Sequence, residues 1–208
     1  MEIRVNATRM ELLKLKNRVR MAQRGHKLLK DKRDELMKIF LGLVRENKEV
    51  RERVERLLGQ AYRSFLVSRA VMSREALEEA LMSSRDELKV SVALKQVMNV
   101  VVPQFKVEDA DESSVYAYGL ATTSAELDDA LGAFAAVLPD LIRLAEVERS
   151  VEILADEIER TRRRVNALEY VLIPELEVAV KNIAMRLGEM ERSNATRLMK
   201  IKDIVRGE

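Results

Sequence analysis

The feature that most constrains this chain is a seam of apolar residues with a 3.5-residue period over about seven heptads. Twelve of its fifteen positions are apolar, no Pro interrupts it, and mostly charged residues surround it. Such a period predicts a helix that packs along its whole length against another helix. We therefore expect a rod rather than a compact domain. The seam runs through Leu12, Leu15, Val19, Ala22, His26, Leu29, Arg33, Leu36, Phe40, Leu43, Asn47, Val50, Val54, Leu57 and Ala61.

The composition agrees with long helices. Charged residues make up 35% of the 208 residues and aromatic residues only 4%, with 3 Pro and no Trp. The absence of Cys excludes disulfides and thiolate metal sites and fits a cytoplasmic protein. No apolar stretch is long enough to span a membrane, and the first residues lack the apolar core of a secretory signal. We expect a cytoplasmic location.

The pattern divides the chain into three segments. Residues 1–81 read as the N-terminal helix, continuous from about residue 7, and residues 124–208 as the C-terminal helix, with Ser124 as its N-cap. Pro139 and Pro174 lie inside the second helix, and each is expected to bend or break it. Residues 82–123 form the middle module.

The middle module contains two Val-rich runs. Alternation from Leu88 to Leu94 and a second run from Val97 to Val102 predict a β-hairpin, with Lys95 and Gln96 as its polar interruption and Pro103 as its end. Residues 108–114 are predicted to form a loop, and the segment around Tyr118 is a candidate third extended piece.

The two helices pair most simply as an antiparallel coiled coil with both chain ends at one tip. In that register opposite residue numbers add up to about 208, which places Asn47 opposite Thr161. The fold class is therefore mainly α, a long antiparallel two-helix coiled coil with a small β-hairpin module in the middle. The predicted helix–helix seam includes Leu12, Leu29, Leu36, Phe40, Asn47, Val54, Thr161, Val165 and Leu172.

The residues assemble no catalytic motif. The glycines of the first helix are isolated, His26 has no His or Cys companion, and no paired Glu-x-x-His is present, so we expect no catalytic residue, no cofactor and no metal. Basic residues, however, dominate the first 33 positions and recur after Arg192. This basic half is a solvated face, a nucleic-acid grip or a contact with an acidic protein sleeve.

Several long stretches carry a resemblance to a known family. They are Val5 to Leu12, Arg24 to Leu36, Leu144 to Glu148, Arg160 to Tyr170 and Ile173 to Leu176, and together they resemble the D subunit of the V-type (in prokaryotes A-type) ATPases. One departure is Ala7, where the family commonly has Pro, a residue that would pre-set the helix start.

The resemblance implies a non-catalytic central rotor shaft. It would transmit torque between ATP hydrolysis or synthesis in a catalytic hexamer and the translocation of H⁺ or Na⁺ by a membrane ring. Its partners would be the catalytic and nucleotide-binding subunits, a small stalk subunit at the middle module, and a socket subunit that links to the ring. The chain would be peripheral on the membrane, without inserting into it, and would bind no nucleic acid.

The resemblance also implies contact residues. The hexamer bore would contact Arg9, Leu13, Arg20, Arg24, Arg197 and Lys200, and the small stalk subunit would contact Val90, Val92, Val100 and Val102. The alternative is a free-standing coiled-coil scaffold or a basic nucleic-acid-binding rod. That alternative explains the seam and the basic half, but not the β-prone insert or the family motifs.

Overall fold

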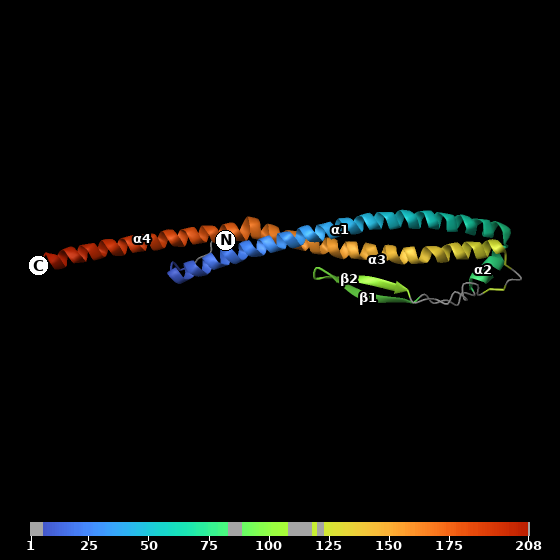
Figure 1. Cartoon of the computed structure of the whole chain (residues 1–208), viewed down its shortest axis with the longest axis horizontal. Coiled ribbons are helices and arrows are strands. Elements are labelled where there is room, and N and C mark those ends of the chain that lie inside the picture. The colour runs from blue at the N-terminus through green and yellow to red at the C-terminus, as the bar shows by residue number, and fades with distance from the viewer. Residues whose placement is uncertain (1–5, 83–88, 108–117, 120–122, 208) are drawn as a thin grey trace. The chain divides into compact units, whose positions relative to one another are not determined.

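The computed structural model describes residues 6–82, 89–107, 118–119 and 123–207. In chain order the elements are α1 (Arg9–Val71), α2 (Arg74–Met82), β1 (Val90–Val97), β2 (Val100–Val107), α3 (Ala125–Ala167), the π-helix η2 (Leu168–Leu172) and α4 (Ile173–Arg206) (Figure 1). The long N-terminal and C-terminal helices pack antiparallel, and one small antiparallel sheet lies between them in the sequence. The expected fold class is confirmed.

The chain forms two compact units. The first contains Met1–Glu35 and Ile158–Glu208, and the second contains Leu36–Glu157. In the first unit the start of α1 packs against α4 through a core of Leu15, Leu176 and Ile183. Val19, Ala22 and their α4 counterparts flank this core, as the 3.5-residue seam requires. The remaining described faces of both helices carry mostly polar and charged residues.

The register of the first unit differs from the expected one. Arg9 faces Glu191 and Gln23 faces Glu177, so the residue numbers of each pair add up to 200 rather than 208. The expected register was wrong because it assumed that both chain ends meet at one tip. Instead α4 continues past Glu191 for about four turns, through residues 192–206, with no described α1 residue opposite it.

In the second unit the rest of α1 pairs with α3. Val50 and Val54 pack against Val137, and Tyr62 meets Phe134 edge-on with ring centroids 5.4 Å apart. A further cluster joins α2 to the start of α3 through Leu77, Ala80 and Leu127.

The first helix is not continuous to residue 81, so that expectation was wrong. Helix α1 ends at Val71, and α2 begins afresh at Arg74. Ser73 starts it, since its Oγ accepts a hydrogen bond from the Ala76 backbone N–H at 3.3 Å and its carbonyl accepts one from Leu77. The apolar seam stops at Ala61, and the expected helix extrapolated beyond the pattern that supported it.

The predicted hairpin is confirmed, but its turn lies elsewhere. The strands are antiparallel with Val97 opposite Val100, and the two turn residues Met98 and Asn99 have φ of 47° and 67°. Two positive φ values identify a type I′ turn, whose twist suits a two-residue hairpin. Lys95 and Gln96, the expected turn, belong to β1, and Pro103 lies inside β2 opposite Leu94.

The two helical prolines differ in their effects. Helix α3 runs through Pro139 without interruption, so the break expected there is absent. Pro174 is the second residue of α4, which directly follows η2, and at this junction the Ile173 N–H reaches back to the Leu168 carbonyl. A proline ring clashes with the carbonyl four residues earlier in an α-helix, and the wider π turn accommodates this mismatch.

Candidate interaction surfaces

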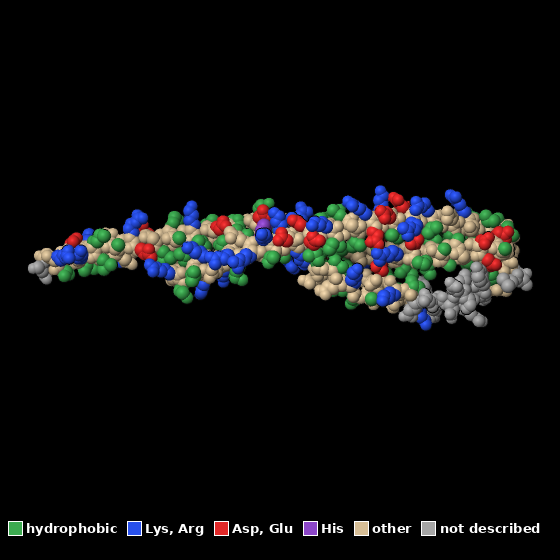
Figure 2. Space-filling model, in the orientation of Figure 1, with side chains coloured by type: hydrophobic (Ala, Val, Ile, Leu, Met, Phe, Trp, Pro, Cys, Tyr) green, Lys and Arg blue, Asp and Glu red, His purple; other side chains and the backbone are tan. Residues whose placement is uncertain are grey.

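The first surface is the basic end of the first unit. The six residues implied as hexamer-bore contacts, Arg9, Leu13, Arg20, Arg24, Arg197 and Lys200, are all exposed there. Arg9 holds Glu191 in an ion pair with Nη2 and Oε1 2.5 Å apart, and the hydrogen bond to Glu191 raises the pKa of Arg9. Figure 2 shows Lys and Arg side chains gathered along this part of α1.

A groove is lined by residues of both helices of this pair. Its volume is about 360 Å³, with Val19 and Val180 contributing apolar surface and Lys16, Arg20 and Lys181 contributing positive charge. Glu177, also in the lining, accepts a hydrogen bond from Gln23 Nε2 at 3.3 Å. The groove therefore places a net positive charge beside apolar side chains on the flank of the helix pair.

The unpaired end of α4 is the second surface. Beyond Glu191 it carries five large exposed apolar side chains, and Val205 is 70% exposed. An isolated helix of this length is marginally stable in water, and contiguous exposed apolar residues mark a contact surface. The exposed apolar residues are Leu198, Met199, Ile201, Ile204 and Val205.

The hairpin is the third surface, and its register separates the four residues implied as stalk-subunit contacts. Val90 and Val92 are exposed on one face, whereas Val100 and Val102 are buried on the other. The sequence interpretation missed Leu94, which is 75% exposed on the face of Val90 and Val92. The alternation from Leu88 to Leu94 already places Leu94 on this face, so the signal for this contact residue was present in the sequence.

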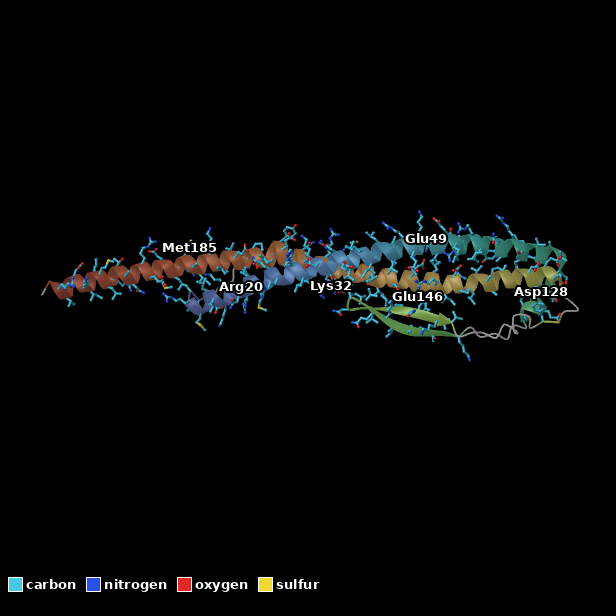
Figure 3. All side chains as sticks on the ribbon, viewed as in Figure 1. Arg20, Lys32, Glu49, Asp128, Glu146 and Met185 are labelled. Atoms are coloured by element: carbon cyan, nitrogen blue, oxygen red, sulfur yellow. The ribbon has the colours of Figure 1, made fainter. Side chains whose placement is uncertain are left out.

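An ionic network fixes the hairpin to the helices of its unit. The Phe105 backbone N–H donates to Glu146 Oε2 at 3.1 Å, and Glu146 Oε1 accepts from Arg143. Arg143 also donates to Glu46 of α1 through Nε at 3.0 Å. Figure 3 labels Glu146 on α3 beside the hairpin. The hydrogen bond to Glu46 raises the pKa of Arg143, partly opposed by desolvation, so this arginine stays charged at all working pH values.

The predicted seam residues differ in how deeply they are buried. Leu36, Val54, Thr161 and Val165 are buried, and Leu12, Leu29, Phe40 and Asn47 are half-buried. Leu172, the last residue of the π-helix η2, is 42% exposed, so this predicted seam position is not buried. His26 lies in the seam region and contacts Glu169, with Nε2 and Oε2 3.3 Å apart.

The described residues form neither a cluster of metal-ligating side chains nor a membrane-spanning helix. Within residues 6–82, 89–107, 118–119 and 123–207, no three His, Cys, Asp or Glu side chains converge as a metal site would require. None of the helices in the same ranges combines the length and the apolar character needed to cross a bilayer.

Comparison with known proteins decides the family. The family model for the D subunit of ATP synthase matches residues 11–203. The chain belongs to the ATP synthase D subunit family. It is 55% identical over 205 residues to the V-type ATP synthase D subunit of Acetivibrio thermocellus, covering 98% of this chain and 92% of that protein.

Other members of the family give the same result. The V-type ATP synthase D subunit of Clostridioides difficile is 53% identical, covering 98% of this chain and 92% of that protein, and the one of Clostridium novyi is 50% identical, covering 99% and 97%. The resemblance noted in the sequence is therefore confirmed, and the chain is a subunit of a V/A-type ATPase. Its partners include other subunits of that complex.

Proposed function

We propose that this D subunit is the non-catalytic central rotor shaft of its ATPase. It transmits torque between ATP hydrolysis or synthesis in the catalytic hexamer and the translocation of H⁺ or Na⁺ by the membrane ring. The proposal rests on one observation: in the first unit α4 continues beyond the section that is paired with α1 and ends as a single helix. That end combines exposed apolar residues with Arg197 and Lys200.

The helix pair supports this role mechanically. Two packed helices resist bending and twisting better than one, because each side chain in the seam is held by several residues of the facing helix. A bearing must also avoid deep contacts that would trap one angle, and energetic hot spots concentrate in well-packed pockets. The exposed, mostly basic end of the first unit offers a charged surface instead.

Charge reversal tests the bearing. Arg9→Glu, Arg20→Glu and Arg24→Glu combined should loosen the coupling of ATP hydrolysis to ion transport, because these exposed cations would face an acidic sleeve. The matched control is Arg45→Glu, Arg56→Glu and Arg63→Glu, which makes the same charge change on exposed α1 positions of the second unit. Equal coupling ratios in the two reconstituted complexes would refute an electrostatic bearing.

A cross-link tests rotation itself. The chain has no Cys, so Lys200→Cys introduces a single thiol at the unpaired end of α4. A disulfide between this thiol and an engineered cysteine in the hexamer bore should stop ATP turnover, and reduction should restore it. Continued turnover with the cross-link in place would show that the proposed shaft does not rotate against the hexamer.

We further propose that the hairpin docks the small stalk subunit, with Val90 and Val92 in the contact, while the opposite end of the shaft meets the socket subunit. The apolar hairpin face supports this assignment, since large exposed apolar patches mark protein–protein contacts. Replacing residues 90–107 by a short Gly-Ser linker should release the small subunit from the purified complex. Its undiminished co-purification would refute the assignment.

A further inference from the structure

The two edges of the hairpin differ in their capacity to hydrogen-bond another strand. In a two-residue hairpin the pair beside the turn, Val97 and Val100, exchanges both backbone hydrogen bonds, and bonded and non-bonded pairs then alternate. At non-bonded pairs the N–H and C=O groups point away from the partner strand. On β1 these outward-pointing residues are Val90, Val92, Leu94 and Gln96, and on β2 they are Val101, Pro103, Phe105 and Val107.

The outer edge of β2 is closed. Pro103 has no N–H to offer, and the Phe105 N–H already donates to Glu146 on α3. The bond to Glu146 also confirms the alternation, because it requires that this N–H point away from β1. Figure 1 shows β2 on the α3 side of the hairpin.

The outer edge of β1 is open. Among the described residues, no backbone hydrogen bond outside the hairpin reaches Val90, Val92 or Leu94. The side chains of these three residues are exposed on one face of the sheet. A two-stranded hairpin is marginal by itself, and edge strands are templates for an added strand.

The positive charge of the hairpin indicates the charge of the strand that it would bind. Residues 89–107 contain Lys89, Lys95 and Lys106 and no Asp or Glu, and all three lysines are exposed. No ion pair involves these lysines among the described residues. An added strand that matches this surface would alternate apolar residues, for the Val90–Val92–Leu94 face, with carboxylates for the lysines.

We propose that β1 is a docking edge for strand addition, and that its occupant is an extended acidic segment with alternating apolar residues from a partner subunit. This inference rests on the proposed role of the hairpin as a contact surface and specifies its mode. Main-chain hydrogen bonds from the outward groups of β1 would supply affinity, and the exposed apolar face would select side chains of the added strand.

Residue-resolved amide hydrogen exchange tests the proposal, with the isolated chain compared to the assembled ATPase. The amides of Ser91, Ala93 and Lys95 are bonded to β2 and should be protected in both samples. Those of Val90, Val92 and Leu94 should exchange fast in the isolated chain and slow about tenfold or more on assembly. Equal exchange of these three amides in the two samples would overturn the proposal.

A proline pair provides the matched variants. Val92→Pro removes an outward N–H from the β1 edge and leaves the bonds within the hairpin intact, whereas Val101→Pro does the same on the closed β2 edge. The assembly-dependent protection of Val90 and Leu94 should disappear in Val92→Pro and persist in Val101→Pro. Continued protection of the Phe105 amide reports that the hairpin still folds.

Two outcomes separate this proposal from its alternatives. Protection of the β1 edge that grows with the concentration of the isolated chain would identify a second copy as the occupant and overturn the partner assignment. The β1 amides could be unprotected in the complex while ATP turnover is normal and is still stopped by the disulfide at Lys200→Cys. That result would overturn strand addition and leave the proposed rotor role intact. Failure of strand addition is therefore distinguishable from failure of the proposed shaft.

Discussion

The backbone N–H of Phe105 in β2 donates a hydrogen bond to the carboxylate of Glu146 in α3 at 3.1 Å. This carboxylate is largely shielded, with its side chain 14% exposed, and Arg143 neutralises it from the same helix. A hydrogen bond to a charged group in such a setting is worth about 1.5–3 kcal/mol. The contact therefore fixes the outer edge of β2 against α3.

Removal of this contact should loosen the hairpin. We expect Glu146→Ala to increase the exchange rate of the Phe105 amide about tenfold or more, because the donor loses its acceptor. Glu148→Ala, which removes an exposed partner of Arg51, serves as the control and should leave that rate unchanged. An unchanged Phe105 rate in Glu146→Ala would show that the hairpin is held by side-chain packing alone.

The same contact should be insensitive to alkaline pH. The hydrogen bond to Glu46 raises the pKa of Arg143 above its ordinary value in the folded chain, so the stability from its charge is complete below the unfolded pKa and is lost only above the folded pKa. Between pH 7 and pH 10 the protection factor of Phe105, corrected for intrinsic exchange, should stay constant. A fall in this range would point to another titrating group.

A better turn sequence should stabilise the hairpin. Met98 and Asn99 both occupy the left-handed region, which an Asn-Gly pair accommodates at lower cost. We expect Met98→Asn with Asn99→Gly to stabilise the hairpin by about 1 kcal/mol, measured as slower exchange of the Lys95 and Val97 amides. Faster exchange in this variant would contradict the type I′ assignment.

The two helical prolines should respond differently to Ala. Pro139→Ala restores a missing donor inside α3 and should raise the free energy of unfolding by about 1–3 kcal/mol. Pro174→Ala should gain less, because η2 already accommodates that proline. Urea titrations of the two variants provide the comparison, and a larger gain at Pro174 would show that η2 has another cause.

The two serines that precede α2 and α3 should contribute differently to stability. Ser73→Ala should cost about 1 kcal/mol, because its Oγ caps α2. Ser124 precedes α3, but its buried Oγ has no partner among the described residues, so the hydroxyl capping expected from the sequence is not observed there. Ser124→Ala should therefore be nearly neutral in thermal unfolding, and a cost equal to that of Ser73→Ala would contradict this interpretation.

Periodic patterns made the helices and the hairpin predictable. The seam from Leu12 repeats often enough to outweigh local exceptions such as Arg33 and Asn47. The break after Val71 was not predictable from the seam, since the seam had already ended at Ala61. The turn was misplaced because Met98 lacks the usual chemistry of a left-handed position.

The surfaces were harder to predict than the elements. Val100 and Val102 pair with Val97 and Lys95, on the face opposite to Val90 and Val92, and which of these two faces is buried depends on what packs against the hairpin in the folded chain. The contact between Glu146 and the hairpin carries no local signal, because Phe105 lies 41 residues away and the contact exists only after the hairpin meets α3. Charge patterning alone pointed to the exposed cations of the first unit.

The unpaired end of α4 has an elastic consequence for the proposed rotor shaft, which would carry torque. Segments joined end to end carry the same torque, so the most compliant segment takes up most of the twist. Residues 192–206 form a single helix of about 22 Å in series with a two-helix section. This end would wind and unwind with each catalytic step while the paired section turns nearly as a rigid body, which would smooth the delivery of stepwise work.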